Sequence, residues 1–305
     1  MTDRPVSFPE SSVVDLGAER SSVDAALEAV CASSLGLLPE RIADAVRYSL
    51  RGPGKRLRGI LLMYAYRAAG GVHDPAPLAA AIEIVHAYSL VHDDLPCMDD
   101  DELRRGRPTT HIVYGNATAV MAGVLMVPLA ARCVAAAGAS MGLEAATRAI
   151  IVETLMHAAG AAGMIGGQLL DLRAEGERLS LDALETIHRA KTGALIAAAA
   201  RIGGLAAGAG PAAVDALERY GTDVGLAFQI VDDVLDVTAT SAQLGKEAGR
   251  DVALGKSTYP SLLGVSGAND RALALVQDGC RGLREAGLLT PELRHVADLV
   301  ITRTN

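Results

Sequence analysis

The sequence of 305 residues is 50% hydrophobic but only 3% aromatic, so Ala, Leu, Val and Ile must fill most of its interior. Such a composition favours closely packed helices. The formal net charge of −8 argues against a nucleic-acid partner, because binding to the phosphate backbone normally needs a basic surface. A chain of this length can bury a large core in one or two domains.

The beginning of the chain is polar and lacks the apolar stretch of a secretory signal. We expect residues 1–20 to form a flexible N-terminal segment. The four cysteines, Cys31, Cys97, Cys133 and Cys280, show neither a CxxC pair nor the spacing of zinc ligands, which indicates reduced thiols. Both features predict a cytoplasmic protein.

Apolar residues recur at helical spacing in almost every segment, whereas alternating strand-like runs are essentially missing. The first helix is indicated by Val23, Leu27 and Val30. A second should begin at Pro39, where proline suits the first turn, and end before the Gly-Pro-Gly break at 52–54.

Further along, residues 112–131 form the longest uncharged stretch. It contains Asn116 and Pro128, so we predict a buried core helix rather than a membrane span. Ser180 should cap the helix that follows it, and apolar residues recur at helical spacing over 214–231. None of the breaks resembles a domain linker. The sequence therefore predicts one all-α domain, 1–305, of roughly ten or more helices.

The first acidic motif is DDLPCMDDDE, beginning at Asp93. Asp93 and Asp99 would face different sides of an ideal helix, so Pro96 must end or bend the helix if their carboxylates converge. Oxygen ligands without His or Cys suit Mg²⁺, which binds through one or two carboxylates plus substrate phosphates. Arg104 and Arg105 follow directly and provide planar donors for the same phosphate oxygens.

The second acidic motif is DDVLD, comprising Asp232, Asp233 and Asp236. On a helix these carboxylates share one face, and such crowding is unfavourable unless a cation joins them. Apolar residues flank the motif, which is unusual for a solvated surface. A single motif of this kind is at least as often an exposed acidic turn as a metal site. Two such motifs in one apolar helical chain favour a shared metal site.

Basic residues accompany both motifs. Residues 54–58, GKRLR, follow the Pro-Gly break, and glycine with cations in a loop is suited to binding a diphosphate. Lys191 and Thr192 lie between the acidic motifs. The run 245–251, followed by Lys256, has the composition of a lid that closes over substrate.

Six ordered segments carry a closer resemblance. They are GKRLRG from Gly54, HAYSLVHDDLPCMDDDELRRGRPTTH from His86, GGQLLDL from Gly166, HRAKTGAL from His188, GLAFQIVDDVLD from Gly225 and LGKEAGRDVALGKSTYP from Leu244. Together they resemble the trans-isoprenyl diphosphate synthases, the polyprenyl synthetase family, over nearly the full chain. The resemblance implies an isoprenoid synthase fold around a central cavity, a homodimer, and about three Mg²⁺ ions in each active site.

The same resemblance implies roles for individual residues. The metal ligands would be Asp93, Asp94, Asp99, Asp232, Asp233 and Asp236. Contacts to an allylic diphosphate, dimethylallyl or geranyl, would come from Arg104, Lys191, Gln229, Lys246 and Lys256. Isopentenyl diphosphate would contact Lys55, Arg58, His86 and Arg105. Backbone carbonyls at Lys191 and Thr192 would stabilise the allylic cation formed when the diphosphate leaves.

Product length should depend on the helix that precedes Asp93. Ser89 and Tyr88 lie about one turn before it and Val85 about two turns before it. Family members that make farnesyl diphosphate commonly carry an aromatic residue at the position of Tyr88, so we predict a farnesyl product. Geranylgeranyl diphosphate remains the alternative, because the CMDDDELRRGRPTTH segment resembles synthases of both kinds.

Two other functions are less favoured. A terpene cyclase would need a different second metal motif and no isopentenyl site, and a non-catalytic partner subunit should have lost Asp or Lys residues from a motif. The chain departs from most relatives at Val124, where an acid is usual. We expect this change to remove a polar group from a buried helix. A basic C-terminal contact to substrate would depend on Arg303.

Overall fold

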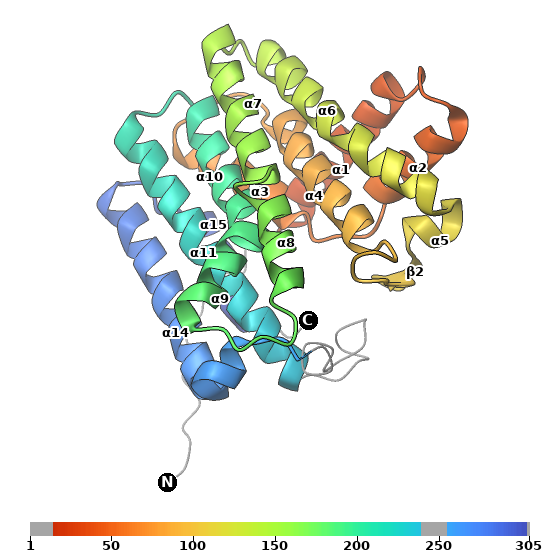
Figure 1. The fold of residues 1–305 in the computed structure, drawn as a ribbon. Coiled ribbons are helices and arrows are strands. Elements are labelled where there is room, and N and C mark those ends of the chain that lie inside the picture. Colours follow the sequence, from red (N-terminus) through yellow and green to blue (C-terminus); the bar gives the residue numbers. More distant parts are fainter. Residues whose placement is uncertain (1–14, 239–254, 304–305) are drawn as a thin grey trace.

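Helices dominate the computed structural model, which describes residues 15–238 and 255–303 (Figure 1). They are α1 (Gly17–Ser34), α2 (Glu40–Leu50), α3 (Leu57–Ala68), α4 (Ala76–Asp93), α5 (Thr110–Tyr114), α6 (Asn116–Ser140), α7 (Ala145–Ala159), α8 (Met164–Arg173), α9 (Leu181–His188), the π-helical turn η1 (Arg189–Gly193), α10 (Ala194–Ala206), α11 (Pro211–Thr238), α14 (Tyr259–Glu285) and α15 (Pro291–Thr302). A small antiparallel hairpin of β1 (Leu103–Arg104) and β2 (Arg107–Pro108) follows α4. The predicted all-α fold is confirmed.

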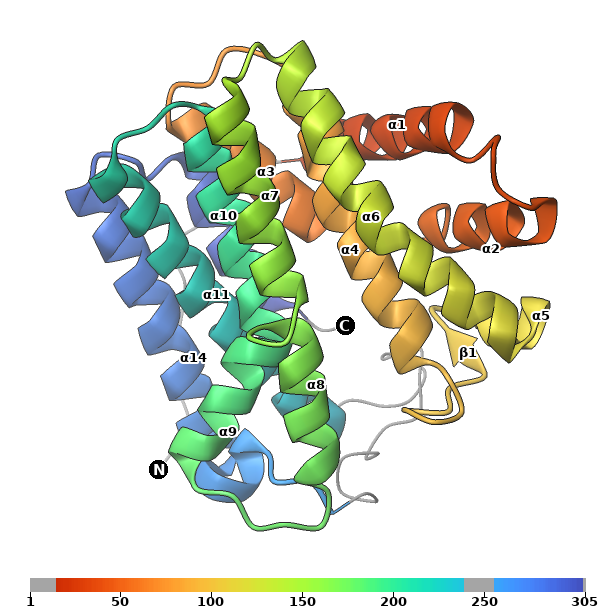
Figure 2. The same cartoon turned by 45° about the horizontal axis from the view of Figure 1, so that its top comes forward.

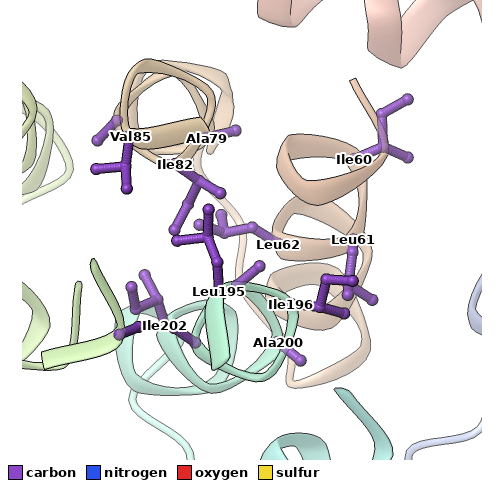
Figure 3. Close-up of a cluster of buried hydrophobic side chains, with 14 of the residues drawn as sticks. Ile60, Leu61, Leu62, Ala79, Ile82, Val85, Leu195, Ile196, Ala200 and Ile202 are labelled. Atoms are coloured by element: carbon purple, nitrogen blue, oxygen red, sulfur yellow. The ribbon is translucent and has the colours of Figure 1, made fainter. Parts of the chain in front are cut away.

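The centre of the core lies where α3, α4 and α10 meet, and Figure 3 shows Leu62, Ile82 and Leu195 from these helices packed together. Helix α10 also packs on α11, α11 packs along α14, and α4 packs along α6. Glycine permits a close approach at Gly203, where a Cβ atom would lie only 2.6 Å from the carbonyl oxygen of Leu62. The small-residue composition therefore serves helix packing, as predicted.

Several predicted helix ends are confirmed. The Ser180 hydroxyl accepts a hydrogen bond from the Ala183 N–H and so caps α9. Pro39 directly precedes α2, and α2 ends at Leu50, before the Pro-Gly break. Because these signals depend on local backbone chemistry, they can be read without knowledge of the tertiary structure.

Two predicted segments lie wholly or mostly outside the described residues. The lid predicted over 245–251 lies outside them, and so does most of the flexible segment predicted over 1–20. Helix α1, however, begins at Gly17, because the buried apolar residues on its inner face anchor it against α4 and α3. Residues 17–20 of the predicted segment are therefore helical, and its flexibility stays a prediction.

The uncharged stretch 112–131 is not one buried helix, which corrects that prediction. Helix α5 ends at Tyr114, and α6 begins at Asn116. Gly115 between them has a φ of 85°, which glycine adopts without strain, so the chain turns there. Helix α6 and the stretch Ala145–Arg173 are long and apolar enough to cross a membrane, but core helices of soluble proteins meet the same criteria, so this is weak evidence for a span.

Candidate active site

The first acidic motif begins at the C-terminal end of α4. Asp93 is the last residue of this helix, and the chain then turns back so that the Asp99 N–H donates a 2.8 Å hydrogen bond to the Asp93 carbonyl. The turn contains Pro96, as predicted, and brings the two aspartates together. Burial, and then the charge of Asp99, raises the pKa of Asp93 to about 6, although Lys191 opposes this effect. A bound cation would relieve this unfavourable arrangement.

Asp94, by contrast, is paired with an arginine of the same chain. It is 3% exposed, and Arg104 donates to it through Nε at 2.8 Å and also through Nη2. The same guanidinium donates to Asp101 at 3.0 Å. The hairpin of β1 and β2 places Arg104 there, beside the end of α4 (Figure 1). Asp94 therefore orients Arg104 towards the metal motif.

The second motif lies in the last turns of α11, and the C-terminal ends of α4 and α11 point towards the same side of the molecule (Figure 2). Asp233 is 3% exposed and accepts hydrogen bonds from the Gln229 side chain and the Tyr259 N–H, each 3.1 Å long. Asp236 is also buried. The side chain of Asp232 is 42% exposed and accepts a hydrogen bond from Arg303.

Two lysines lie between the motifs and share one carboxylate. Lys191 Nζ is 2.7 Å and Lys256 Nζ is 3.0 Å from Oδ2 of Asp171, on α8. The charge of Lys191 lowers the pKa of Asp93, and the charge of Asp99 helps to raise the pKa of Lys256 against its burial. The two lysines, held by α8, thus partly balance the negative charge at the end of α4.

The π-helical turn η1 carries Lys191 and Thr192 into this region. Such turns are frequent at functional sites. Gly167 of α8 lets the turn approach closely, because a Cβ there would lie 2.2 Å from the Lys191 backbone nitrogen. The Thr192 hydroxyl donates a 2.9 Å hydrogen bond to Gln229, whose amide holds Asp233. The turn is thereby fixed to the second motif.

A cationic cleft of about 850 Å³ adjoins the second motif, because Arg303, which lines the cleft, donates to Asp232. Its lining brings together all four residues that the resemblance assigned to isopentenyl diphosphate, Lys55, Arg58, His86 and Arg105. Burial, and then the charge of Arg303, lowers the pKa of Lys55. Burial and the neighbouring arginines lower the pKa of His86 well below its usual range, so this ring is neutral and serves as a hydrogen-bonding group.

The three residues predicted to determine product length, Val85, Tyr88 and Ser89, all lie on α4 and are buried. Val85 is fully buried against the central core (Figure 3), and Ser89 donates a hydrogen bond to the His86 carbonyl. Tyr88 is 6% exposed, and its ring meets His92 edge-on at a centroid distance of 5.0 Å. Lys246 lies outside the described residues.

Asp171 and Gln168 were not predicted as site residues, although both lie within the GGQLLDL segment. No spacing in the sequence relates Asp171 to the two lysines that it binds. Gln168 is 5% exposed, and neither atom of its amide finds a hydrogen-bond partner among the described residues. A buried polar group of this kind is costly unless a ligand satisfies it.

The prediction for Val124 needs correction. Its side chain is 50% exposed on the outer face of α6, whereas we expected a buried position. Helix α6 is buried along one face only, because it packs on α4 and α7 and presents its other side to solvent. The absence of an acid at this position therefore changes the surface and leaves the core unaltered.

The donor chemistry fits Mg²⁺. Carboxylates, lysines and arginines of the described residues lie near the ends of α4 and α11, and oxygen ligands of this kind suit Mg²⁺. Within residues 15–238 and 255–303, no three acidic, His or Cys side chains converge tightly enough to enclose a metal by themselves. An Mg²⁺ ion that takes several ligands from a substrate diphosphate needs only one or two carboxylates from the protein.

The polyprenyl synthetase family profile matches residues 39–280. The chain belongs to this family. It is 47% identical to a farnesyl diphosphate synthase of Escherichia coli, over 86% of this chain and 89% of that protein. It is 39% identical to a geranylgeranyl diphosphate synthase of Cyanophora paradoxa, over 88% of this chain and 89% of that protein.

A solved structure is similar throughout. The geranyltransferase of Helicobacter pylori, complexed with magnesium and isoprenyl diphosphate, has a TM-score of 0.80 and 30% identity, covering 95% of this chain and 97% of that one. The predicted family, the isoprenoid synthase fold and the class of trans-prenyltransferase are confirmed.

The bridge through Asp171 gives a testable effect on stability. Burial alone would raise the pKa of Asp171, but Lys191 and Lys256 lower it to about 2. The pKa of Asp171 is lower in the folded than in the unfolded protein. The ionised carboxylate therefore stabilises the fold above about pH 4, and this stabilisation is lost as the pH falls towards 2. Asp171→Asn should lower the unfolding free energy by about 2 kcal/mol at pH 7, as measured by urea denaturation.

The matched control is Glu175→Gln. The Glu175 carboxylate lies 3.4 Å from Lys256 Nζ and its side chain is 35% exposed, so the expected change is below about 0.5 kcal/mol. Equal losses in the two variants, or a loss for Asp171→Asn that does not shrink between pH 4 and pH 2, would contradict the assignment.

Proposed function

We propose that this prenyltransferase condenses isopentenyl diphosphate with dimethylallyl or geranyl diphosphate, with farnesyl diphosphate as its main product. The observation that carries the proposal is the juxtaposition at the ends of α4 and α11. There, Asp93 and Asp99 lie within electrostatic reach of Lys191 and Lys256, which Asp171 holds, and the cationic cleft opens nearby. Two neighbouring diphosphate sites of different chemistry suit a reaction between two diphosphates.

The allylic diphosphate would bind at the two acidic motifs. The aspartates of the two motifs would hold Mg²⁺, with about three ions per site, and bound Mg²⁺ would neutralise the charge that develops on the departing diphosphate; they are Asp93, Asp94, Asp99, Asp232, Asp233 and Asp236. Lys191 and Lys256 would donate to the same phosphate oxygens. Asp94 and Asp233 also accept hydrogen bonds from Arg104 and Gln229, and these contacts would orient the two donors towards the same diphosphate.

The condensation proceeds by ionisation, addition and proton loss. The carbon–oxygen bond to the allylic diphosphate breaks, and the double bond of isopentenyl diphosphate attacks the resulting cation to form a carbon–carbon bond. Carbonyl groups of Lys191 and Thr192 would stabilise the cation, and the apolar interior would keep water away from it. A proton then leaves the new cation for the released diphosphate and restores a double bond.

A farnesyl product is supported by Tyr88, a bulky buried residue on α4 before Asp93. The relative from Escherichia coli that is named a farnesyl diphosphate synthase is 47% identical, against 39% for the geranylgeranyl diphosphate synthase from Cyanophora. Geranylgeranyl diphosphate remains the second candidate, because its synthases share the same motifs. No observation favours a terpene cyclase or a non-catalytic subunit.

The test is incubation of the purified chain with isopentenyl diphosphate and each allylic primer, with and without EDTA. We expect a farnesyl product that requires Mg²⁺. Activity that survives full chelation would contradict the metal proposal, and cyclic hydrocarbons would indicate a cyclase. A product of four isoprene units would replace farnesyl by geranylgeranyl diphosphate without changing the reaction.

We also propose a single-domain, cytoplasmic homodimer. The support for the homodimer is an exposed apolar stripe on α6, which includes Val120, Met121 and Val124, each at least 38% exposed. Contiguous apolar surface of this kind is typical of a protein interface.

Met121→Arg should shift the protein from dimer to monomer in sedimentation velocity, because a charge would be buried in the interface without a partner. Val72→Arg is the control, since Val72 is 87% exposed in the loop between α3 and α4, and this loop leads to Pro77, which contacts Cys133, twelve residues beyond Met121 on α6. A wild-type protein that sediments as a monomer would refute the proposed dimer.

A further inference from the structure

A buried carboxylate lies beneath the cationic cleft. Glu83 of α4 is 2% exposed and lines the cleft together with His86. Its Oε1 accepts a 2.9 Å hydrogen bond from the Gly59 N–H, and its Oε2 lies 3.9 Å from Arg56 Nη1. A buried carboxylate is costly unless it is hydrogen-bonded and paired with a cation. Glu83 has both kinds of partner.

The first partner is the start of α3. Gly59 is the third residue of this helix, so its N–H is one of the donors that the helix itself cannot satisfy. Arg56, in the N-cap position, has a φ of 51° and provides no side-chain cap. Glu83 therefore caps α3 from a neighbouring helix, with its charge at the positive end of the helix dipole.

Two further arginines that line the cleft are influenced by the charge of Glu83. Burial lowers the pKa of both Arg58 and Arg105, and the charge of Glu83 is the next largest influence and raises both. Arg105 Nη1 also donates to the Pro53 carbonyl at 2.6 Å, and Arg58 Nη1 lies 3.4 Å from His86 Nε2. The other acidic residue in the lining of the cleft, Asp15, is exposed.

We propose that Glu83 is a positioning residue for isopentenyl diphosphate. It fixes the first turn of α3 and holds Arg58 and Arg105 as a pre-arranged anion site, while remaining too deeply buried to contact the diphosphate itself. This inference rests on the proposed function, because it assumes that the cleft binds isopentenyl diphosphate.

The effect should be confined to one substrate. Glu83 precedes Asp93 by ten residues on α4, which is about 15 Å along a helix. Without the charge of Glu83, the arginines of the cleft would repel one another and turn towards solvent, and the incoming diphosphate would have to reorder them. The lysines at Asp171 are held by separate contacts. Binding of the allylic diphosphate should therefore be unaffected.

Glu83→Gln tests the proposal, because glutamine keeps the shape and an acceptor for the Gly59 N–H but removes the charge. We expect KM for isopentenyl diphosphate to rise about tenfold, with kcat and KM for geranyl diphosphate within about twofold of wild type. Asp24→Asn is the matched control. Asp24 accepts a 2.8 Å hydrogen bond from the same Arg56, but its side chain is 48% exposed, so both KM values should stay within about twofold.

If Glu83→Gln does not fold, as judged by circular dichroism, Gly59→Ala provides the test. The added methyl group would lie 3.2 Å from Glu83 Cγ and displace the carboxylate slightly, while alanine favours the helix. We expect a rise of about threefold in KM for isopentenyl diphosphate alone. A folded Glu83→Gln with unchanged KM values, or a parallel rise for both substrates, would overturn the proposal. A wild-type enzyme that does not use isopentenyl diphosphate would refute the proposed function itself.

Discussion

Asp93→Asn is expected to lower kcat by about 10³-fold, with little change in KM for isopentenyl diphosphate. Asparagine matches the size of aspartate, so the end of α4 and the hydrogen bond from Asp99 to the Asp93 carbonyl are preserved. What is lost is a negatively charged oxygen that is already partly desolvated and lies beside a second carboxylate. Without it, the site would hold the proposed Mg²⁺ less firmly, and the departing diphosphate would be less well stabilised. Steady-state kinetics at saturating Mg²⁺ would measure the loss.

Asp100→Asn is the control for this prediction. Asp100 belongs to the same acidic run but is exposed, and its φ of 51° suits asparagine well. Its kcat should stay within about twofold of wild type. A similar loss in both variants would indicate that the general negative charge of the loop matters, and would contradict a specific role for Asp93.

The raised pKa of Asp93 also predicts the direction of a pH effect. In the metal-free protein this carboxyl takes up a proton as the pH falls through about 6, well above the range of an ordinary aspartate. Protons therefore compete with Mg²⁺ at mildly acidic pH. The apparent affinity for Mg²⁺ should weaken from pH 7 to pH 5 in the wild type, and this dependence should be much smaller in Asp93→Asn.

Tyr88→Ala is expected to change the main product from three isoprene units to four or more. Tyr88 lies five residues before Asp93, about 7.5 Å along α4, and its ring is nearly fully buried. Removing the ring would leave room for at least one further isoprene unit, which is about as long as one helical turn. Chromatography of the dephosphorylated products would measure the change.

Tyr88→Phe separates the ring from its hydroxyl. Phenylalanine keeps the edge-on contact with His92 and should keep the wild-type product. If Tyr88→Ala makes no product longer than wild type, or if Tyr88→Phe lengthens the product as much as Tyr88→Ala, the ring does not limit chain length. Geranylgeranyl diphosphate as the wild-type product would also remove the reason for this assignment.

Local signals in the sequence were sufficient for the fold class and for several helix ends. Ser180 and Pro39 act on the backbone next to them, so their effects are readable without tertiary information. The break at Gly115 was missed, because an uncharged run gives no sign that one glycine inside it has a positive φ. The hairpin after α4 was also missed, since strands of two residues are too short to show alternation.

Spacing in the sequence predicted the candidate site where its residues lie close together, whereas contacts between distant segments were predicted only through the family resemblance or were missed. Asp93 and Asp99 are linked by one turn, so their convergence followed from Pro96. The bridge from Asp171 to two lysines joins α8, η1 and the segment before α14, and Glu83 meets the start of α3 across 24 residues. Only helix packing creates such contacts. No regular spacing of residues in the sequence predicts these contacts.

The most direct test of the shared site is calorimetric titration with geranyl thiolodiphosphate, an unreactive allylic analogue. The wild-type protein should bind it only when Mg²⁺ is present. Asp93→Asn and Asp232→Asn should each weaken this binding by at least about tenfold, because the two motifs hold opposite sides of one metal-diphosphate complex. Full retention of Mg²⁺-dependent binding in either variant would contradict the account.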